Sequence, residues 1–192
     1  MHNDRTREAN VMISRKEEGE GAPDGPLVLL VGMMGTGKST VGRAIAARTG
    51  WRYVDNDDLV REATGRTAPE IAAADGATAL RAAESDALTF ALALPPPAVA
   101  GVAGGVVLDA ADRERLRGAD AVVWLRASQD TLAARVGAGE GRTGLQPDPA
   151  VAIAVLAAER EPYYAEVADA VVDVDGRTPE QAAEEIIALF TD

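Results

Sequence analysis

Residues 32–39 read Gly-Met-Met-Gly-Thr-Gly-Lys-Ser, which fits the pattern G-x-x-x-x-G-K-[ST]. The stretch lies between an apolar run at 27–31 and a helix-like segment at 40–49. A strand, a glycine-rich loop and a helix in this order are typical of a phosphate-binding loop, or P-loop. In such a loop backbone N–H groups surround a phosphate, the ammonium of Lys38 meets the terminal phosphates, and the hydroxyl of Ser39 can bind Mg²⁺. The chain is therefore predicted to bind a nucleoside triphosphate.

The distribution of lysine supports this interpretation. Of 19 basic residues only Lys16 and Lys38 are lysines, and Lys16 lies in the polar segment 1–26. The rest of the chain thus keeps its one lysine where a compact charge suits a phosphate. A glycine turn that merely joins a strand to a helix is the alternative, and the flanking pattern disfavours it.

Composition narrows the classes of function. A chain of 192 residues with a net charge of −12 suits one domain and argues against nucleic acid or an anionic membrane as a partner. The chain has no cysteine, which excludes disulfides, thiolate metal sites and a cysteine nucleophile. No apolar run approaches the roughly 18 residues of a membrane span, and no signal peptide is visible. We expect a cytoplasmic monomer with small-molecule ligands.

The pattern along the chain predicts an α/β fold. Residues 1–26 are polar and predict a disordered extension, which leaves 27–192 as a single domain. Strands are predicted at 27–31, 52–54, 98–102, 121–125 and 170–174, and helices at 40–49, within 57–94, and at 110–117, 128–136, 150–166 and 179–189. Residues 137–149 contain four glycines and two prolines and predict a mobile loop. Strands alternating with helices indicate three layers, α/β/α, around a five-stranded parallel sheet.

Acidic residues follow the second predicted strand. Asp55 and Asp57 should therefore lie at the carboxyl edge of the sheet, facing the P-loop. One carboxylate could hold Mg²⁺ or its water while another accepts a proton from an attacking hydroxyl, as phosphoryl transfer requires. Capping of the following helix by these residues is an equally good interpretation.

Other candidates are weaker when taken singly. Arg81 and Glu84 share one helical face and could form a simple surface ion pair. Gly104 and Gly105 follow the third strand, where backbone could approach a ligand or merely turn. Arg142, in the predicted mobile loop, could reach the transferring phosphoryl group or remain solvated.

Six segments follow one another along the chain: Gly-Met-Met-Gly-Thr-Gly-Lys-Ser-Thr-Val-Gly-Arg from residue 32, Tyr-Val-Asp-Asn-Asp from 53, Leu-Arg-Ala-Ala-Glu from 80, Gly-Gly-Val-Val from 104, Val-Trp-Leu-Arg-Ala from 123, and Glu-Arg-Glu-Pro-Tyr-Tyr-Ala-Glu-Val-Ala from 159. Their content and order resemble the shikimate kinase family over residues 27–190. The resemblance implies a P-loop fold of the nucleoside-monophosphate-kinase type with a mobile lid at about 137–149. It also implies phosphoryl transfer from ATP, with Mg²⁺ as cofactor, to shikimate, giving shikimate 3-phosphate.

The resemblance also implies roles for individual residues. Lys38 and Arg142 stabilise the phosphoryl group in flight, and Asp57 orients the acceptor hydroxyl and accepts its proton. Nucleotide-binding residues are Gly35, Thr36, Gly37, Lys38, Ser39, Thr40, Arg135 and Arg177, the last two around the adenine. Acceptor-binding residues are Asp57, Arg81, Gly104, Gly105 and Arg160, in which the two arginines grip a carboxylate and Glu84 holds Arg81. The Mg²⁺ site consists of Ser39 and, through water, Asp55.

Two departures from the family pattern concern the acceptor. Ala103 stands where the family has the first of three glycines, which adds a methyl group where backbone could approach the ligand. Arg142 is followed by Thr-Gly-Leu instead of the usual Pro-Leu-Leu, which leaves the arginine less preorganised. Two alternatives therefore stay open. One is a gluconate-like kinase that acts on another polyol acid or on a cyclitol, and the other is a nucleotide-binding module without catalysis.

Overall fold

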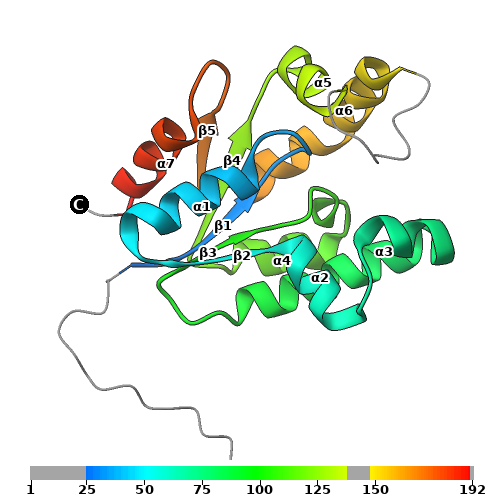
Figure 1. Ribbon diagram of the computed structural model, residues 1–192, viewed down its shortest axis with the longest axis horizontal. Coiled ribbons are helices and arrows are strands. Elements are labelled where there is room, and N and C mark those ends of the chain that lie inside the picture. The colour runs from blue at the N-terminus through cyan, green and yellow to red at the C-terminus, as the bar shows by residue number, and fades with distance from the viewer. Residues whose placement is uncertain (1–24, 138–147, 191–192) are drawn as a thin grey trace, which may run out of the picture.

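The computed structural model describes residues 25–137 and 148–190, which are built around one parallel sheet (Figure 1). The strands are β1 (Leu27–Val31), β2 (Arg52–Asp55), β3 (Ala98–Gly101), β4 (Ala121–Arg126) and β5 (Ala170–Asp173). They lie in the order β2-β3-β1-β4-β5, and every neighbouring pair is parallel. The predicted strands are thus confirmed, and their ends agree with the structure to within one residue.

Helices cover both faces of the sheet. They are α1 (Lys38–Thr49), α2 (Asn56–Thr64), α3 (Ala68–Leu92), the short 3₁₀ helix η1 (Val106–Leu108), α4 (Ala110–Arg117), α5 (Gln129–Gly137), α6 (Pro149–Val167) and α7 (Pro179–Ala188). Helices α1 and α7 pack together on one face, while α4 and α6 lie on the other (Figure 1). This arrangement confirms the predicted three-layer α/β/α fold.

The helical region predicted within 57–94 consists of two helices. Gly65 takes a left-handed conformation, with φ 69°, that ends α2, and Thr67 begins α3. Thr67 and Glu70 form a capping box in which each side chain accepts from the other's backbone N–H. Within α3, Gly76 has φ 84° and ψ 178°, so the helix axis bends there. Helices α2 and α3 pack against each other beside β2.

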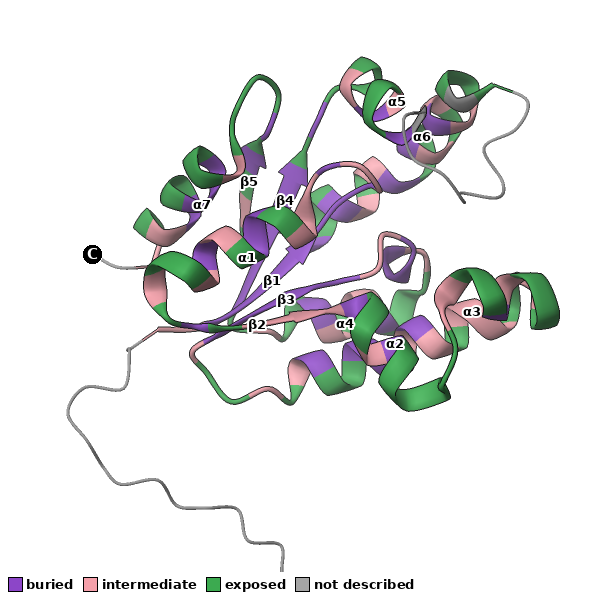
Figure 2. Cartoon of the chain, viewed as in Figure 1, coloured by how far each residue is buried: buried purple, intermediate pink, exposed green. Residues whose placement is uncertain are grey.

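The core lies at the sheet and explains the apolar runs in the sequence. All of β1, and β4 up to Leu125, are buried, because helices cover both faces of the central strands (Figure 2). The edge strands β2 and β5 are less buried. Since all strands are parallel, the loops that follow β1, β2 and β3 emerge at the same edge, and the candidate site residues lie there.

Two predictions fall on other parts of the chain. The extension at 1–26 lies almost entirely outside the described residues, as does most of the lid at 137–149, including Arg142. Within the described parts, no helix combines the length and the apolarity needed to cross a membrane.

Candidate active site

The P-loop connects β1 to α1 through backbone conformations that favour glycine. Gly35 and Gly37 have φ values of 85° and 91°, in the left-handed region that L-residues with side chains rarely adopt. The ammonium of Lys38 donates to the carbonyls of Gly32 at 2.7 Å and Met33 at 3.0 Å. These bonds hold the charge over the loop, next to the N–H groups at the start of α1. A loop of this kind is a binding site for phosphate.

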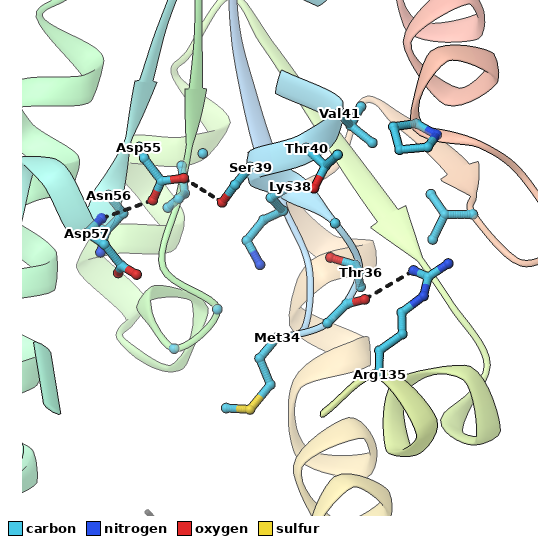
Figure 3. Close-up of a pocket in the computed structure, with 18 of the residues that line it drawn as sticks. Met34, Thr36, Lys38, Ser39, Thr40, Val41, Asp55, Asn56, Asp57 and Arg135 are labelled. Atoms are coloured by element: carbon cyan, nitrogen blue, oxygen red, sulfur yellow. Dashed lines mark hydrogen bonds between the residues drawn. The ribbon is translucent and has the colours of Figure 1, made fainter. Parts of the chain in front are cut away.

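Asp55 links β2 to the P-loop. Its Oδ2 accepts a hydrogen bond from the hydroxyl of Ser39 at 2.5 Å, and its Oδ1 accepts from the N–H of Asp57 at 3.1 Å (Figure 3). Burial alone would raise the pKa of Asp55, but hydrogen bonds from Ser39, Tyr53 and Asp57 outweigh it and lower the pKa below its ordinary value. Asp55 is therefore the N-cap of α2 and at the same time a carboxylate beside Ser39, so its capping role does not exclude a place in a metal site.

Oxygen ligands from the protein are close enough to one another to suit Mg²⁺. Ser39 supplies a hydroxyl oxygen and Asp55 a carboxylate, and both line the same cavity as the P-loop. Mg²⁺ is usually held by one or two such protein groups, with phosphate oxygens and water completing its shell. The residues present therefore fit a magnesium nucleotide.

Two arginines on other helices line the same cavity as the P-loop. Arg81, on α3, forms an ion pair with Glu84, and burial raises the pKa of Glu84 although this guanidinium opposes the shift. Arg160, on α6, is only 6% exposed, and its Nε has no hydrogen-bond partner among the described residues. The carboxylate of Glu159 lies 3.9 Å from this Nε, beyond hydrogen-bond distance. A buried guanidinium with an unsatisfied donor is suited to binding an anionic ligand, because unpaired buried donors are energetically costly.

The loop after β3 lies beside these arginines. A Cβ on Gly105 would stand 1.9 Å from Nη1 of Arg81, and one on Gly104 would stand 3.0 Å from the carbonyl oxygen of Gly32. The buried hydroxyl of Tyr164 donates to the carbonyl of Gly104 at 2.6 Å, which fixes the loop. Ala103 packs against the core and is not among the described residues that line the cavity. The expectation that its methyl group narrows the site therefore finds no support in this arrangement.

The other end of the cavity is bounded by α5 and by the loop before α7. Arg135 donates from Nη1 to the carbonyl of Gly35 at 3.1 Å, and Arg177 pairs with Glu185. Val174 and Pro179 also line this end. A mixture of guanidinium groups and apolar surface suits a nucleobase, on whose face an arginine can stack.

One cavity of about 910 Å³ brings these groups together. The predicted site residues that line it are Gly35, Thr36, Gly37, Lys38, Ser39, Thr40, Asp55, Asp57, Arg81, Gly104, Gly105, Arg135, Arg160 and Arg177. In Figure 3, Lys38 lies between Asp57 and Arg135. Arg142, the remaining predicted site residue, lies outside the described residues.

The sequence analysis assigned no role to two residues near this cavity. The hydroxyl of Tyr53 donates to Oδ2 of Asp55 at 2.6 Å. The alternation of side chains along β2 places Tyr53 and Asp55 on one face, and this was the available signal. Asn56 lines the cavity, yet its Nδ2 is buried without a hydrogen-bond partner among the described residues, and no sequence pattern indicated it.

Comparison with known proteins gives consistent results. The sequence model of the shikimate kinase family matches residues 34–191. The shikimate kinase of Moorella thermoacetica is 38% identical over 83% of this chain and 91% of its own length, and that of Salinispora arenicola is 40% identical over 86% and 98%. The structure of shikimate kinase from Acinetobacter baumannii in complex with shikimate superposes with a TM-score of 0.81, at 30% identity over 85% of this chain and 92% of that one.

Proposed function

Because the chain belongs to the shikimate kinase family, we propose that it transfers the γ-phosphoryl group of ATP to a hydroxyl group of shikimate. The observation that carries the proposal is the arrangement of charge in one cavity. Lys38 and Ser39 lie at the P-loop, while Arg81 and Arg160 lie where an acceptor would bind. An acceptor with a carboxylate and several hydroxyl groups matches this second group of residues.

The arginines in the cavity favour an acceptor that carries a carboxylate. The buried Nε of Arg160 has no hydrogen-bond partner among the described residues, and Arg81 is paired with Glu84, so both guanidinium groups lie in the cavity with capacity for a ligand. A guanidinium binds a carboxylate through two parallel hydrogen bonds, which a hydroxyl group cannot form. Gly104 and Gly105 line the cavity beside Arg160 and Arg81, so their backbone N–H groups would be near the same ligand. A neutral cyclitol would leave the arginines without a partner.

Asp57 is the residue that we assign to the acceptor hydroxyl. It lies in the first turn of α2, in the cavity that also contains Lys38. An acceptor alcohol becomes more acidic as it is phosphorylated, so a carboxylate can orient the hydroxyl and take its proton. The N–H of Asp57 is held by Asp55, which fixes the start of the helix that presents it.

Transfer requires stabilisation of charge on the phosphoryl group. The ammonium of Lys38 and the N–H groups at the start of α1 act on the phosphates. Ser39 and Asp55 would hold Mg²⁺, which when bound neutralises charge on the phosphates. Arg142 is assigned to the phosphoryl group by the family resemblance alone, and Arg135 and Arg177 to the adenine.

The decisive experiment is a coupled assay of ADP release with MgATP and shikimate, beside quinate, gluconate, inositols and a control without acceptor. We expect saturable release with shikimate and none above the control with the inositols. ADP release with gluconate alone would mean that gluconate is the acceptor in place of shikimate. Binding of ATP without ADP release on any acceptor would favour a nucleotide-binding module. The proposal includes a monomer acting in the cytoplasm, and size-exclusion chromatography with light scattering tests the first part.

A further inference from the structure

Tyr53 belongs to the site but has no role in the proposed reaction. It lies two residues before Asp55 on β2, so both side chains point to the same face of the sheet. Oδ2 of Asp55 accepts from Tyr53 at 2.6 Å and from Ser39 at 2.5 Å. The phenol therefore contacts the carboxylate that would face a magnesium nucleotide, and it does so through the same oxygen as Ser39.

Two glycines leave room for the ring and the hydroxyl of Tyr53. A Cβ on Gly42, in α1, would stand 2.1 Å from Cε2 of Tyr53. A Cβ on Gly101, beside Asp55 in β3, would stand 2.9 Å from the hydroxyl oxygen of Tyr53. The guanidinium of Arg43 lies over the ring, 5.8 Å from its centroid. Contacts on three sides thus hold the hydroxyl at one point, next to Asp55.

The carboxylate of Asp55 is held by donors on both of its oxygens. With Ser39 and Tyr53 on Oδ2 and the N–H of Asp57 on Oδ1, three donors determine how the carboxylate is turned.

We propose that Tyr53 is a positioning residue for the magnesium nucleotide: its hydroxyl fixes the carboxylate of Asp55 against Ser39. This inference rests on the proposed function, because it needs a metal–nucleotide complex in this cavity. Groups that orient a metal-binding carboxylate contribute to affinity although they do not touch the metal. A tyrosine that served only to fill space between α1 and β2 would act through its ring, and a phenylalanine would replace it fully.

The test is Tyr53→Phe, which keeps the ring and removes the hydroxyl. Mn²⁺, which takes the same oxygen ligands, is titrated into ADP-saturated protein, and free Mn²⁺ is followed by electron paramagnetic resonance. We expect Mn²⁺ binding to weaken about tenfold, with an intact fold by circular dichroism and an unchanged KM for shikimate. Tyr163→Phe is the matched control, because the ring of Tyr163 packs under Arg113 and does not line the described cavity.

A second background shows whether Tyr53 acts through Asp55. In Asp55→Asn protein, adding Tyr53→Phe should change Mn²⁺ binding by less than about twofold. Equal Mn²⁺ affinity of Tyr53→Phe and unaltered protein would overturn the inference, as would an additive effect in the Asp55→Asn background or no Mn²⁺ binding by unaltered protein. Weaker Mn²⁺ binding by Tyr53→Phe together with no turnover of shikimate would keep the inference and overturn the proposed acceptor.

Discussion

The cavity has two walls, one formed mainly by backbone and the other mainly by side chains. Residues 35–40, which we call the donor wall because the proposal places ATP there, consist largely of backbone whose conformation is set by glycines within a few positions of one another. The acceptor wall, where we propose that shikimate binds, consists mainly of charged side chains from separate helices and one loop: Asp57, Arg81, Gly104, Gly105 and Arg160. The donor wall is thus a local structure, whereas the acceptor wall exists only once the chain has folded.

This difference explains what each wall can recognise. Backbone N–H groups and one ammonium fit any polyphosphate, so the donor wall identifies a class of ligand. Guanidinium groups held by Glu84 and by burial suit a planar anion, so in the proposed function the acceptor wall would select a carboxylate among possible acceptors. Changes to the donor wall should therefore lower turnover on every acceptor, and changes to the acceptor wall should lower affinity for shikimate alone.

The largest effect should come from the donor wall. Lys38→Met removes the ammonium that stabilises the phosphates, and we expect kcat to fall at least about 10³-fold. Circular dichroism should show an intact fold, since the ammonium donates to the loop carbonyls of Gly32 and Met33 and lines the cavity instead of the core. Arg48→Met removes a charge at the opposite end of α1, where Arg48 pairs with exposed Glu184, and should leave kcat unchanged. Near-normal turnover of Lys38→Met would contradict the P-loop assignment.

The acceptor wall should respond through binding. Arg81→Ala and Arg160→Ala each remove a charge-assisted contact, and we expect the KM for shikimate to rise about 10- to 100-fold. The KM for ATP should stay within about twofold, because the proposal assigns both arginines to the acceptor alone. Arg61→Ala, which removes an exposed arginine paired with Asp58, is the control. Equal effects on both KM values would erase the distinction between the two walls.

The same difference determines how much could be predicted. Residues 32–39 predicted the donor wall because a P-loop depends on neighbours in the sequence. The strands were predicted to within one residue, since buried parallel strands are continuous apolar runs. Arg81 and Arg160 had no local signal that separated them from surface arginines, and only the family resemblance selected them.

The contact between Tyr53 and Asp55 could not be predicted from the sequence for a further reason. Alternation along a strand indicates that Tyr53 and Asp55 share a face, but many such pairs do not touch. The contact depends on space left by Gly42 and Gly101, which lie in other elements. A sequence read one segment at a time does not reveal such a fit, because it depends on how α1, β2 and β3 come together.

A smaller change to the acceptor wall displaces the guanidinium of Arg81 without removing its charge. In Gly105→Ala the new Cβ would stand 1.9 Å from Nη1 of Arg81, so this flexible side chain must move. The φ of Gly105 is −96°, which alanine tolerates, so we expect little change in melting temperature. The KM for shikimate should rise about tenfold, which is the lower end of the range expected for the loss of a hydrogen bond to a charged group. Gly118→Ala, at the exposed end of α4 with its nearest contact at 3.5 Å, is the control. An unchanged KM would show that the observed orientation of Arg81 does not serve the acceptor.

The smallest effect should come from Ala103, although it is the plainest departure from the family pattern. Its methyl group packs against the core and is absent from the described cavity lining, so Ala103→Gly should change the KM for shikimate by less than about twofold. The variant should instead lose about 0.4–1 kcal/mol of stability, because glycine increases the freedom of the unfolded chain. Chemical denaturation measures this loss, and the coupled assay measures KM. A clear fall in KM would mean that the methyl group does restrict the acceptor, and that the position of residue 103 outside the cavity changes when the ligand binds.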